Sequence, residues 1–225
     1  MAALLRAKYV QINSVKGSLK SHEKWWLDNV SNAYVLDIIK EGYQLPLSGI
    51  PPQSCLKNNK SAREHPIFVS TEIEKLVQSG IVQKLEKIPT VVNPLTVAES
   101  AAGKLRLVLD VRTVNPLINV PHCKFEDLKV ASNYFTKGCF MITFDLKSGY
   151  HHVDIHPAYH QYLGFAWENV YYTYVSLPFG VSSAGIVFTK ILKELVKRWR
   201  SQSIPCVVYL DDGLIIAKSY ILAER

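Results

Sequence analysis

The feature that most constrains the fold is a pair of adjacent carboxylates, Asp211 and Asp212, between two short apolar runs. The runs at 204–210 and 213–217 are typical of β-strands, and Gly213 can adopt the positive φ angle that a tight turn needs. The sequence therefore predicts a β-hairpin with two acids at its tip. Partial burial of two like charges is costly, and a hard divalent cation with oxygen ligands offsets that cost. On its own the pair is explained equally well by a solvated Asp-Asp-Gly turn.

The composition indicates a globular chain with one sizeable core. The chain has 225 residues, 48% of them hydrophobic, and a net charge of +7 from 26 Lys and Arg against 19 Asp and Glu. This basic excess suits a polyanionic partner such as nucleic acid, although many ordinary proteins are equally basic. The four cysteines lack metal-ligand spacing and the N-terminus lacks a secretory signal, so we expect an intracellular protein of the cytoplasm or nucleus. No run approaches the roughly 20 apolar residues of a membrane span.

The first part of the chain is the least regular. Residues 1–60 are expected to form an N-terminal extension punctuated by prolines. A helix is predicted to follow it, because Thr71 and Glu74 match a capping box and Gly80 is typical of a helix C-terminus.

Apolar periodicity predicts several further elements. They are strands at 93–97 and 105–110, a helix over 125–134, a strand at 140–144 that leads into Asp145, a hairpin formed by 163–167 and 170–175, and a long helix over 183–200. Arg106 alternates with Leu105 and Leu107 and so faces away from them, as an ordinary solvated strand cation would. A metal site at His151 and His152 is disfavoured, because neighbouring side chains of a strand point to opposite faces.

Three motifs then occur in a fixed order. They are Phe144-Asp145 with Tyr150 five residues later, the turn Leu177-Pro178-Phe179-Gly180 that opens the long helix, and the hairpin tip Tyr209-Leu210-Asp211-Asp212. In order and spacing they resemble motifs A, B and C of the reverse transcriptase domain of retroelements. Residues 105–115 are similar to the fingers strand that precedes motif A in that family. The resemblance covers about residues 60–225, and the combination is far more specific than any single motif.

The resemblance implies an α+β fold with the fingers and palm of a right-hand polymerase, in which an antiparallel palm sheet packs on helices. The implied parts are an N-terminal extension at 1–60 and a reverse transcriptase domain at 61–225, with fingers at about 61–119 and 153–183 and a truncated palm at about 120–152 and 184–225. The thumb and the RNase H domain that follow motif C in the family are expected to be absent. We therefore expect a fragment of a longer polyprotein or a decayed element copy.

The implied activity is RNA-directed DNA synthesis from dNTP on a primed RNA or DNA template, without a membrane partner. Asp145 and Asp211 would end or turn central strands of one antiparallel sheet, which would bring them together. They are the implied ligands of two Mg²⁺ ions, with Mn²⁺ as the alternative, and Asp212 is a supporting carboxylate.

The resemblance also implies a set of dNTP-binding residues. They are Lys104, Arg106, Leu146, Tyr150, Phe179 and Gly180. Arg106 would bind the triphosphate, because a guanidinium suits phosphate oxygens. The ring of Tyr150 would lie under the sugar and clash with a 2′-hydroxyl, which favours dNTP over rNTP; a core tyrosine is the alternative. Gly180 would let the backbone approach the nucleotide closely.

The sequence departs from the family pattern in two places. Only Lys104 lies near the position of the second fingers cation that many relatives carry before Arg106. Ala184-Gly185 replaces the Ala-Pro pair of many relatives, and glycine softens a helix start. Residues 34–43 and 93–97 are similar to DIRS-type elements, which pair a reverse transcriptase with a tyrosine recombinase.

Two other functions compete with polymerisation. The first is a catalytically inactive remnant that folds and only binds nucleic acid through its basic surface. The second is a metal-dependent phosphoryl hydrolase that uses Asp145 and Asp211. The hydrolase hypothesis ranks last, because it gives Tyr150 and the 177–180 turn no role.

Overall fold

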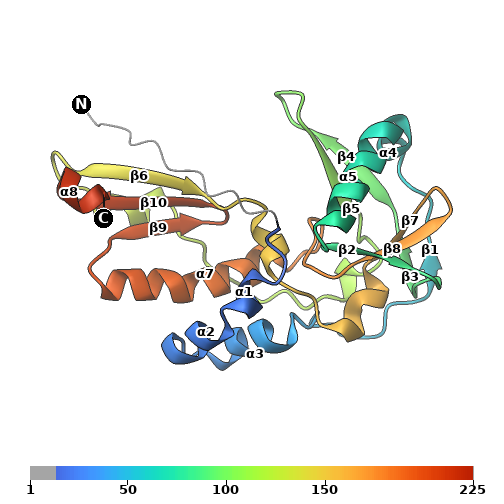
Figure 1. The fold of residues 1–225 in the computed structure, drawn as a ribbon, viewed down its shortest axis with the longest axis horizontal. Helices are drawn as coiled ribbons and strands as arrows, with labels where there is room; N and C mark the ends of the chain where they lie inside the picture. The colour runs from blue at the N-terminus through green and yellow to red at the C-terminus, as the bar shows by residue number, and fades with distance from the viewer. Residues whose placement is uncertain (1–13, 225) are drawn as a thin grey trace.

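A three-stranded antiparallel sheet, which contains the hairpin with Asp211 and Asp212, lies at one end of the molecule (Figure 1). The computed structural model describes residues 14–224. The strands, in spatial order, are β6 at Phe140–Asp145, β10 at Asp212–Ala217 and β9 at Cys206–Tyr209. The central strand pairs Asp212 with Asp145 on one side and with Tyr209 on the other. The predicted hairpin and the predicted strand at 140–144 are therefore confirmed, and they share one sheet.

The long helix α7, Ala184–Ser201, lies alongside this sheet (Figure 1). Its apolar side chains recur at helical spacing, which gives it one buried face. The buried apolar residues of this face include Val187, Phe188, Ile191, Leu192 and Val196. At its far end the ring of Trp199 meets the ring of Phe144 from β6 edge to face, with centroids 6.1 Å apart. The predicted helix over 183–200 is confirmed, with each end shifted by one residue.

A five-stranded mixed sheet forms the other end of the molecule (Figure 1). In spatial order its strands are β1 at Ser54–Cys55, β3 at Val91–Asn93, β7 at Gly164–Trp167, β8 at Val170–Tyr174 and β2 at Val82–Leu85. The β7–β8 pair confirms the predicted hairpin, and Glu168 and Asn169 at its tip both have positive φ, as a type I′ turn requires. Two further strands, β4 at Leu95–Glu99 and β5 at Leu105–Leu109, form a separate hairpin.

Residues 14–43 pack onto helix α7 and the segments beside it (Figure 1). They contain the helices α1 at Ser18–Ser21, α2 at Glu23–Asn29 and α3 at Ala33–Glu41. The amide of Asn32 donates a hydrogen bond to Glu194 of α7 at 3.1 Å. The hydroxyl of Tyr43 donates one to Ser183 at 2.8 Å. These contacts tie the segment to the long helix, and the domain boundary at residue 60 stays a prediction.

The helix predicted near Thr71 exists, but its predicted start is wrong. Helix α4 covers Lys60–Glu64 and helix α5 covers Pro66–Gln78. Thr71 lies inside α5, where its hydroxyl donates to the carbonyl of Ile67 at 2.8 Å instead of capping an end. Pro66 begins the helix because its fixed φ suits the first turn. The predicted stop is confirmed, since Gly80 follows the helix with a φ of 72°.

Two other predictions need correction. The helix expected over 125–134 is shorter: α6 covers only Leu128–Ser132. It begins there because the Asp127 carboxylate caps its N-terminus by accepting a hydrogen bond from the backbone N–H of Val130 at 3.0 Å. The histidine pair lies on a 3-10 helix, η2 at Gly149–His152, and not on a strand. The remaining short elements are η1 at Asn115–Leu117, η3 at Pro157–Tyr162 and α8 at Tyr220–Glu224.

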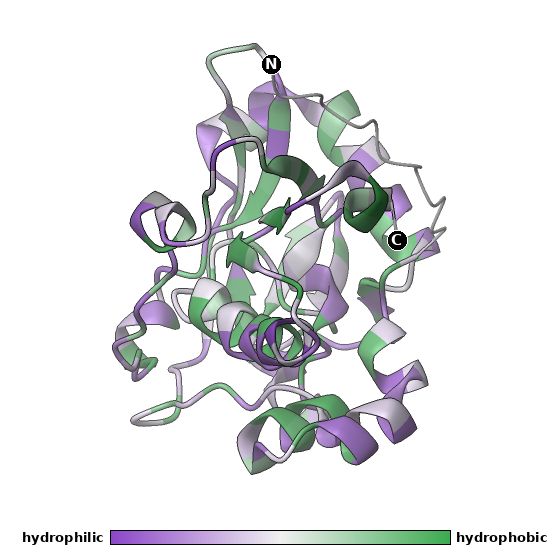
Figure 2. Ribbon diagram, turned by 90° about the vertical axis from the view of Figure 1, so that its left-hand side faces the viewer, coloured by the Kyte–Doolittle hydropathy of each residue, from purple (hydrophilic) through white to green (hydrophobic). Residues whose placement is uncertain are grey.

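The distribution of hydropathy follows the buried and exposed faces of the helices. In Figure 2 green and purple residues alternate along the helices, as expected where one helix face is buried and the other meets water. Within residues 14–224 no helix has the length and the apolar content to cross a bilayer.

Candidate active site

Three carboxylates lie where strands β6 and β10 of the three-stranded sheet meet at one edge. Asp145 is the last residue of β6, Asp212 is the first of β10, and the two are paired across the sheet. Asp211 lies immediately before Asp212 in the hairpin tip, and its carbonyl accepts a hydrogen bond from the backbone N–H of Leu146 at 2.8 Å. A side chain at position 149 would overlap the Asp211 carboxylate, so Gly149 lets the η2 turn approach the acids. The structure thus brings together the three acids that the sequence predicted.

The tip of the hairpin is not built as predicted. Gly213 does not supply the positive φ; that conformation belongs to Leu210, whose φ is 53°. Gly213 lies within β10 opposite Phe144, and the Phe144 ring fills the space that a side chain at 213 would need. The glycine therefore serves packing between strands, while the left-handed residue turns the chain just before Asp211.

The electrostatics of the acids are unfavourable without a partner. Partial burial raises the pKa of Asp211, and the negative charges of Asp145 and Asp212 raise it further. The positive charge of Arg106 opposes this shift. The Oδ1 atom of Asp211 is buried and accepts no hydrogen bond in the described structure. A buried carboxylate oxygen without a donor costs free energy unless a cation or another ligand meets it.

The donor set fits a hard divalent cation. Within residues 14–224 no three His, Cys, Asp or Glu side chains form a ready-made metal shell. Mg²⁺ usually takes one or two carboxylates and completes its octahedron with phosphate oxygens and water, so it needs no such shell. Asp145, Asp211 and Asp212 offer only oxygen ligands, and one of those oxygens lacks a partner. They are the residues that could hold the ion.

An aromatic pair lies beside the acids. Tyr150 on η2 packs against Phe179 with ring centroids 4.9 Å apart and against Phe188 of α7 at 5.7 Å. Burial raises the pKa of Tyr150, and the charge of Asp211 adds to the shift, so the hydroxyl stays protonated. Phe188 supports the ring of Tyr150 from within the core.

The turn before α7 closely approaches the hairpin of β4 and β5. Gly180 has a φ of 113°, and a side chain there would overlap the carbonyl oxygen of Leu109 in β5. Glycine was predicted at this position so that the backbone could approach a nucleotide. The observed reason for glycine is the close contact with the Leu109 carbonyl.

The two cations that were predicted to bind the dNTP, Arg106 and Lys104, differ in their position on the β4–β5 hairpin. Arg106 is exposed in the middle of β5, and its charge lowers the pKa of Asp211. Lys104 is exposed just before the strand, and its backbone N–H donates to Ser100 at 3.1 Å. Within residues 14–224 neither cation forms an ion pair. The charge of Arg106 therefore acts on Asp211, and Lys104 is not among the charges that act on it.

The sequence of the chain matches a family of known polymerases. A model of the family described as reverse transcriptase (RNA-dependent DNA polymerase) matches residues 56–222. The chain belongs to the reverse transcriptase family.

Relatives of this reverse transcriptase chain are polyproteins of transposons. The Pol polyproteins from transposons 297 and gypsy of Drosophila melanogaster are 24% and 26% identical to it and cover 70% and 68% of the chain. The Tf2-3 polyprotein of Schizosaccharomyces pombe is 26% identical and covers 83%. The chain spans 15%, 15% and 13% of the length of these three proteins. A DIRS-type origin stays a prediction.

Solved reverse transcriptases share the fold. The native protease-reverse transcriptase of Prototype Foamy Virus superposes with a TM-score of 0.61 and 22% identity, covering 77% of this chain and 22% of its own. The foamy viral protein in complex with an RNA/DNA hybrid gives a TM-score of 0.64 and 18% identity, covering 96% of this chain and 31% of its own. The predicted fold class, with polymerase fingers and palm, is confirmed.

Sequence reasoning missed one residue of the reverse transcriptase site. The amide of Asn115 donates to the carbonyl of Gly180 at 2.8 Å and accepts from the backbone N–H of Ser182 at 2.9 Å. This double hydrogen bond fixes the turn that carries Phe179. The available signal was an Asn-Pro pair shortly after the 105–110 strand, which marks a turn but not its distant partner.

His151 serves packing. Burial lowers its pKa to about 4, and the neighbouring His152 adds to the shift. The His151 ring contacts Phe179 at 5.7 Å and Tyr174 at 6.3 Å between centroids. It is therefore a neutral core side chain that supports the aromatic pair from behind.

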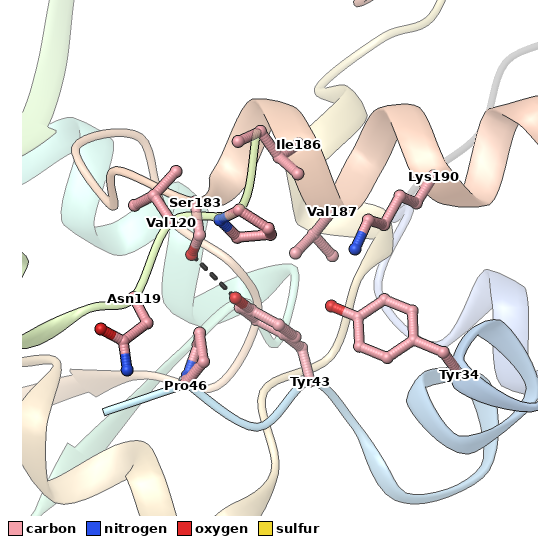
Figure 3. Close-up of a pocket in the computed structure, with 10 residues that line it drawn as sticks. Tyr34, Tyr43, Pro46, Asn119, Val120, Ser183, Ile186, Val187 and Lys190 are labelled. Atoms are coloured by element: carbon pink, nitrogen blue, oxygen red, sulfur yellow. Dashed lines mark hydrogen bonds between the residues drawn. The ribbon is translucent and has the colours of Figure 1, made fainter. Parts of the chain in front are cut away.

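A cavity of about 350 Å³ lies next to α7 but away from the predicted site residues (Figure 3). Tyr34, Tyr43 and Lys190 line it, and the Lys190 amine lies 4.5 Å from the centroid of the Tyr34 ring. The hydrogen bond from Tyr43 to Ser183 forms one wall, and burial raises the pKa of Tyr43. The polar groups of this wall are thus engaged with each other.

Proposed function

We propose that this chain is the polymerase part of a reverse transcriptase, which adds dNTP units to a primer 3′-hydroxyl on an RNA or DNA template. The observation that carries the proposal is the convergence of Asp145, Asp211 and Asp212, with an unpartnered buried oxygen, beside the Tyr150–Phe179 pair. A polymerase of this kind needs acids that bind a metal and a surface that contacts a nucleotide; in the proposed site the three acids would serve the first need and the aromatic pair the second.

The proposed mechanism relies on alignment and charge. Mg²⁺, with Mn²⁺ as the alternative, would supply Lewis acidity toward the attacking hydroxyl and the leaving pyrophosphate. Asp145 and Asp211 would hold it, and Asp212 would add negative charge nearby. Arg106 would bind the triphosphate from the β4–β5 hairpin, because its positive charge already acts on Asp211. Lys104 is proposed as a weaker phosphate contact.

The proposed nucleotide pocket selects deoxyribose. Tyr150 would place its ring against the sugar, with Phe179 and Phe188 restricting its movement. A 2′-hydroxyl would clash with this ring, so rNTP would be excluded. Leu146 and Gly180 would complete the pocket through their backbone.

The four cysteines of the sequence are unpaired, which suits a site of action in the cytoplasm or nucleus.

Primer extension on a homopolymer RNA template tests the proposal. The unmutated chain is expected to extend a DNA primer with dNTP only when Mg²⁺ or Mn²⁺ is present, and Asp211→Asn is expected to abolish extension. Binding of the primed template without any metal-dependent extension would reject the proposal for this chain and support a remnant that only binds nucleic acid.

Tyr150→Ala tests the sugar preference separately. Loss of the ring is expected to raise rNTP incorporation relative to dNTP by about tenfold or more, since the excluded hydroxyl then finds space. An unchanged ratio would leave Tyr150 as a core tyrosine.

A further inference from the structure

Residues outside the family match contact the turn that carries Tyr150. The family match begins at residue 56, whereas the N-terminal segment, residues 14–18, lies well before it. Three side chains of the N-terminal segment bind across to the body of the fold: Ser14 to the carbonyl of Ser79 at 2.7 Å, Lys16 to Asp154 at 2.9 Å and Ser18 to His152 at 2.7 Å. The last two contacts flank the end of η2.

His152 connects the N-terminal segment to the turn after the catalytic strand. Its Nε2 lies 3.3 Å from the carbonyl oxygen of Lys147, and a carbonyl can only accept, so Nε2 carries the proton. Burial lowers the pKa of His152, which keeps the ring neutral. Nδ1 is then an acceptor, and the hydroxyl of Ser18 donates to it. The imidazole thus bridges Ser18 and Lys147, and Tyr150 lies between Lys147 and His152 in the chain.

The bridged turn contains an unfavourable backbone conformation. Ser148 has a φ of 55° although it is not glycine, and such residues persist only where their surroundings fix them. Inside the turn the N–H of His151 donates to Ser148 at 2.9 Å, and the N–H of Val153 donates to Tyr150 at 3.0 Å. Two local hydrogen bonds and the imidazole bridge therefore act together with the ring packing of Tyr150 and His151 to hold the turn in shape.

The ion pair fixes the far end of the same turn. Asp154 accepts from Lys16 and, at 3.4 Å, from the hydroxyl of Ser176. The side chains of Lys16 and Asp154 are 29% and 25% exposed, so the pair is shielded from water more than a surface pair. Gly17 has a φ of 71°, which lets the chain turn between the two anchoring residues.

We propose that the N-terminal segment sets the sugar selectivity of the polymerase by holding the Tyr150 turn, with Ser18 and His152 as positioning residues. The proposal rests on the proposed polymerase function. Neither residue touches the nucleotide; both act through the backbone of 147–152, which places the ring of Tyr150.

The test compares Ser18→Ala with Ser21→Ala. Ser21 lies on the same short helix, but its hydroxyl bonds only to Ser18 and His22 and not to the turn. Loss of the bridging hydrogen bond in Ser18→Ala is expected to lower the preference for dNTP over rNTP by about threefold to tenfold, whereas Ser21→Ala leaves the preference unchanged. In a His152→Gln background, Ser18→Ala is expected to have no further effect, because both changes break one connection.

Amide hydrogen exchange provides a readout that does not depend on activity. The N–H groups of His151 and Val153 are expected to exchange about threefold to tenfold faster in Ser18→Ala than in Ser21→Ala. If the unmutated chain lacks polymerase activity, the proposed function fails, and exchange alone decides whether the N-terminal segment holds the turn. Unchanged exchange, or equal sugar selectivity in the two serine variants of an active chain, would overturn the inference.

Discussion

Two aspartates near strand ends meet opposite environments in the fingers and in the palm. In the fingers, Asp110 follows β5 and is bound by the guanidinium of Arg112 and by the amide of Asn59 at 2.9 Å. The hydrogen bond from Arg112 lowers the pKa of Asp110. In the palm, Asp211 has a buried oxygen without a partner and a raised pKa. The fingers carboxylate is satisfied by its own chain, whereas the palm carboxylate has a buried oxygen that no donor in the described chain meets.

The largest expected difference concerns activity. Asp211→Asn is expected to reduce primer extension by at least about a thousandfold, because a metal ligand and a negative charge are lost together. Asp110→Asn is expected to retain extension within about tenfold, because its carboxylate contacts only protein groups. Steady-state extension rates at saturating dNTP would compare the two. Equal losses would mean that both acids serve the reaction, and the comparison would fail.

The next difference concerns the two fingers cations. Arg106→Ala is expected to raise the KM for dNTP by about tenfold or more, because a charge-assisted hydrogen bond to phosphate is lost. Lys104→Ala is expected to raise it by less than about threefold, as for an exposed charge. Single-nucleotide kinetics measure both values. A larger effect of Lys104→Ala would show that the cation whose charge acts on Asp211 is not the one that binds substrate.

A smaller difference is expected in thermal stability, with opposite signs. Asp211→Asn removes charge repulsion and is expected to raise Tm by about 2–4 °C, since active-site acids often cost stability. Asp110→Asn leaves Arg112 without its carboxylate and is expected to lower Tm by about 2–4 °C. Thermal unfolding without divalent cations measures both shifts. Shifts of the same sign would remove the distinction between the two sites.

The smallest expected effect is the pH dependence of the stability changes that Asp211→Asn and Asp110→Asn cause. The folded-state pKa of Asp211 is raised, so its ionisation lowers stability at neutral pH, and the penalty fades as pH falls through that pKa. The folded-state pKa of Asp110 is lowered, so its contribution is complete above its ordinary pKa and is lost only as pH falls below it. Urea unfolding from pH 7 to about pH 3 should therefore show the Asp211→Asn gain vanish before the Asp110→Asn loss. The reverse order would contradict both assignments.

The sequence predicted the elements whose signals are local. The apolar spacing of α7 and the β-rich runs around Asp145 and Asp211 reflect one buried face each, which periodicity reveals directly. The capping box at Thr71 failed because a second local signal, Pro66, starts the helix earlier.

The parts that the sequence could not predict depend on distant neighbours. Gly213 resembles a turn glycine until Phe144 of another strand is seen to occupy the space beside it. Asn115 acts on Gly180, 65 residues away, and neither residue signals the other in a single sequence. The contact between Ser18 and His152 spans 134 residues and is equally invisible. Side chains that contact a site from outside its sequence motifs can be identified only from the three-dimensional structure.

The packing of residues before position 56 onto the core, to which the hydrogen bond from Tyr43 to Ser183 belongs, has a practical consequence for expression of this region. The family match starts at residue 56, yet the core includes earlier side chains: Trp26, Val35, Ile38, Ile39 and Tyr43. A recombinant fragment cut at the match would expose the apolar surface that these residues cover, and exposed patches of this kind promote aggregation. The shortest soluble product is therefore expected to begin upstream of Trp26, some thirty residues before homology would place its first codon.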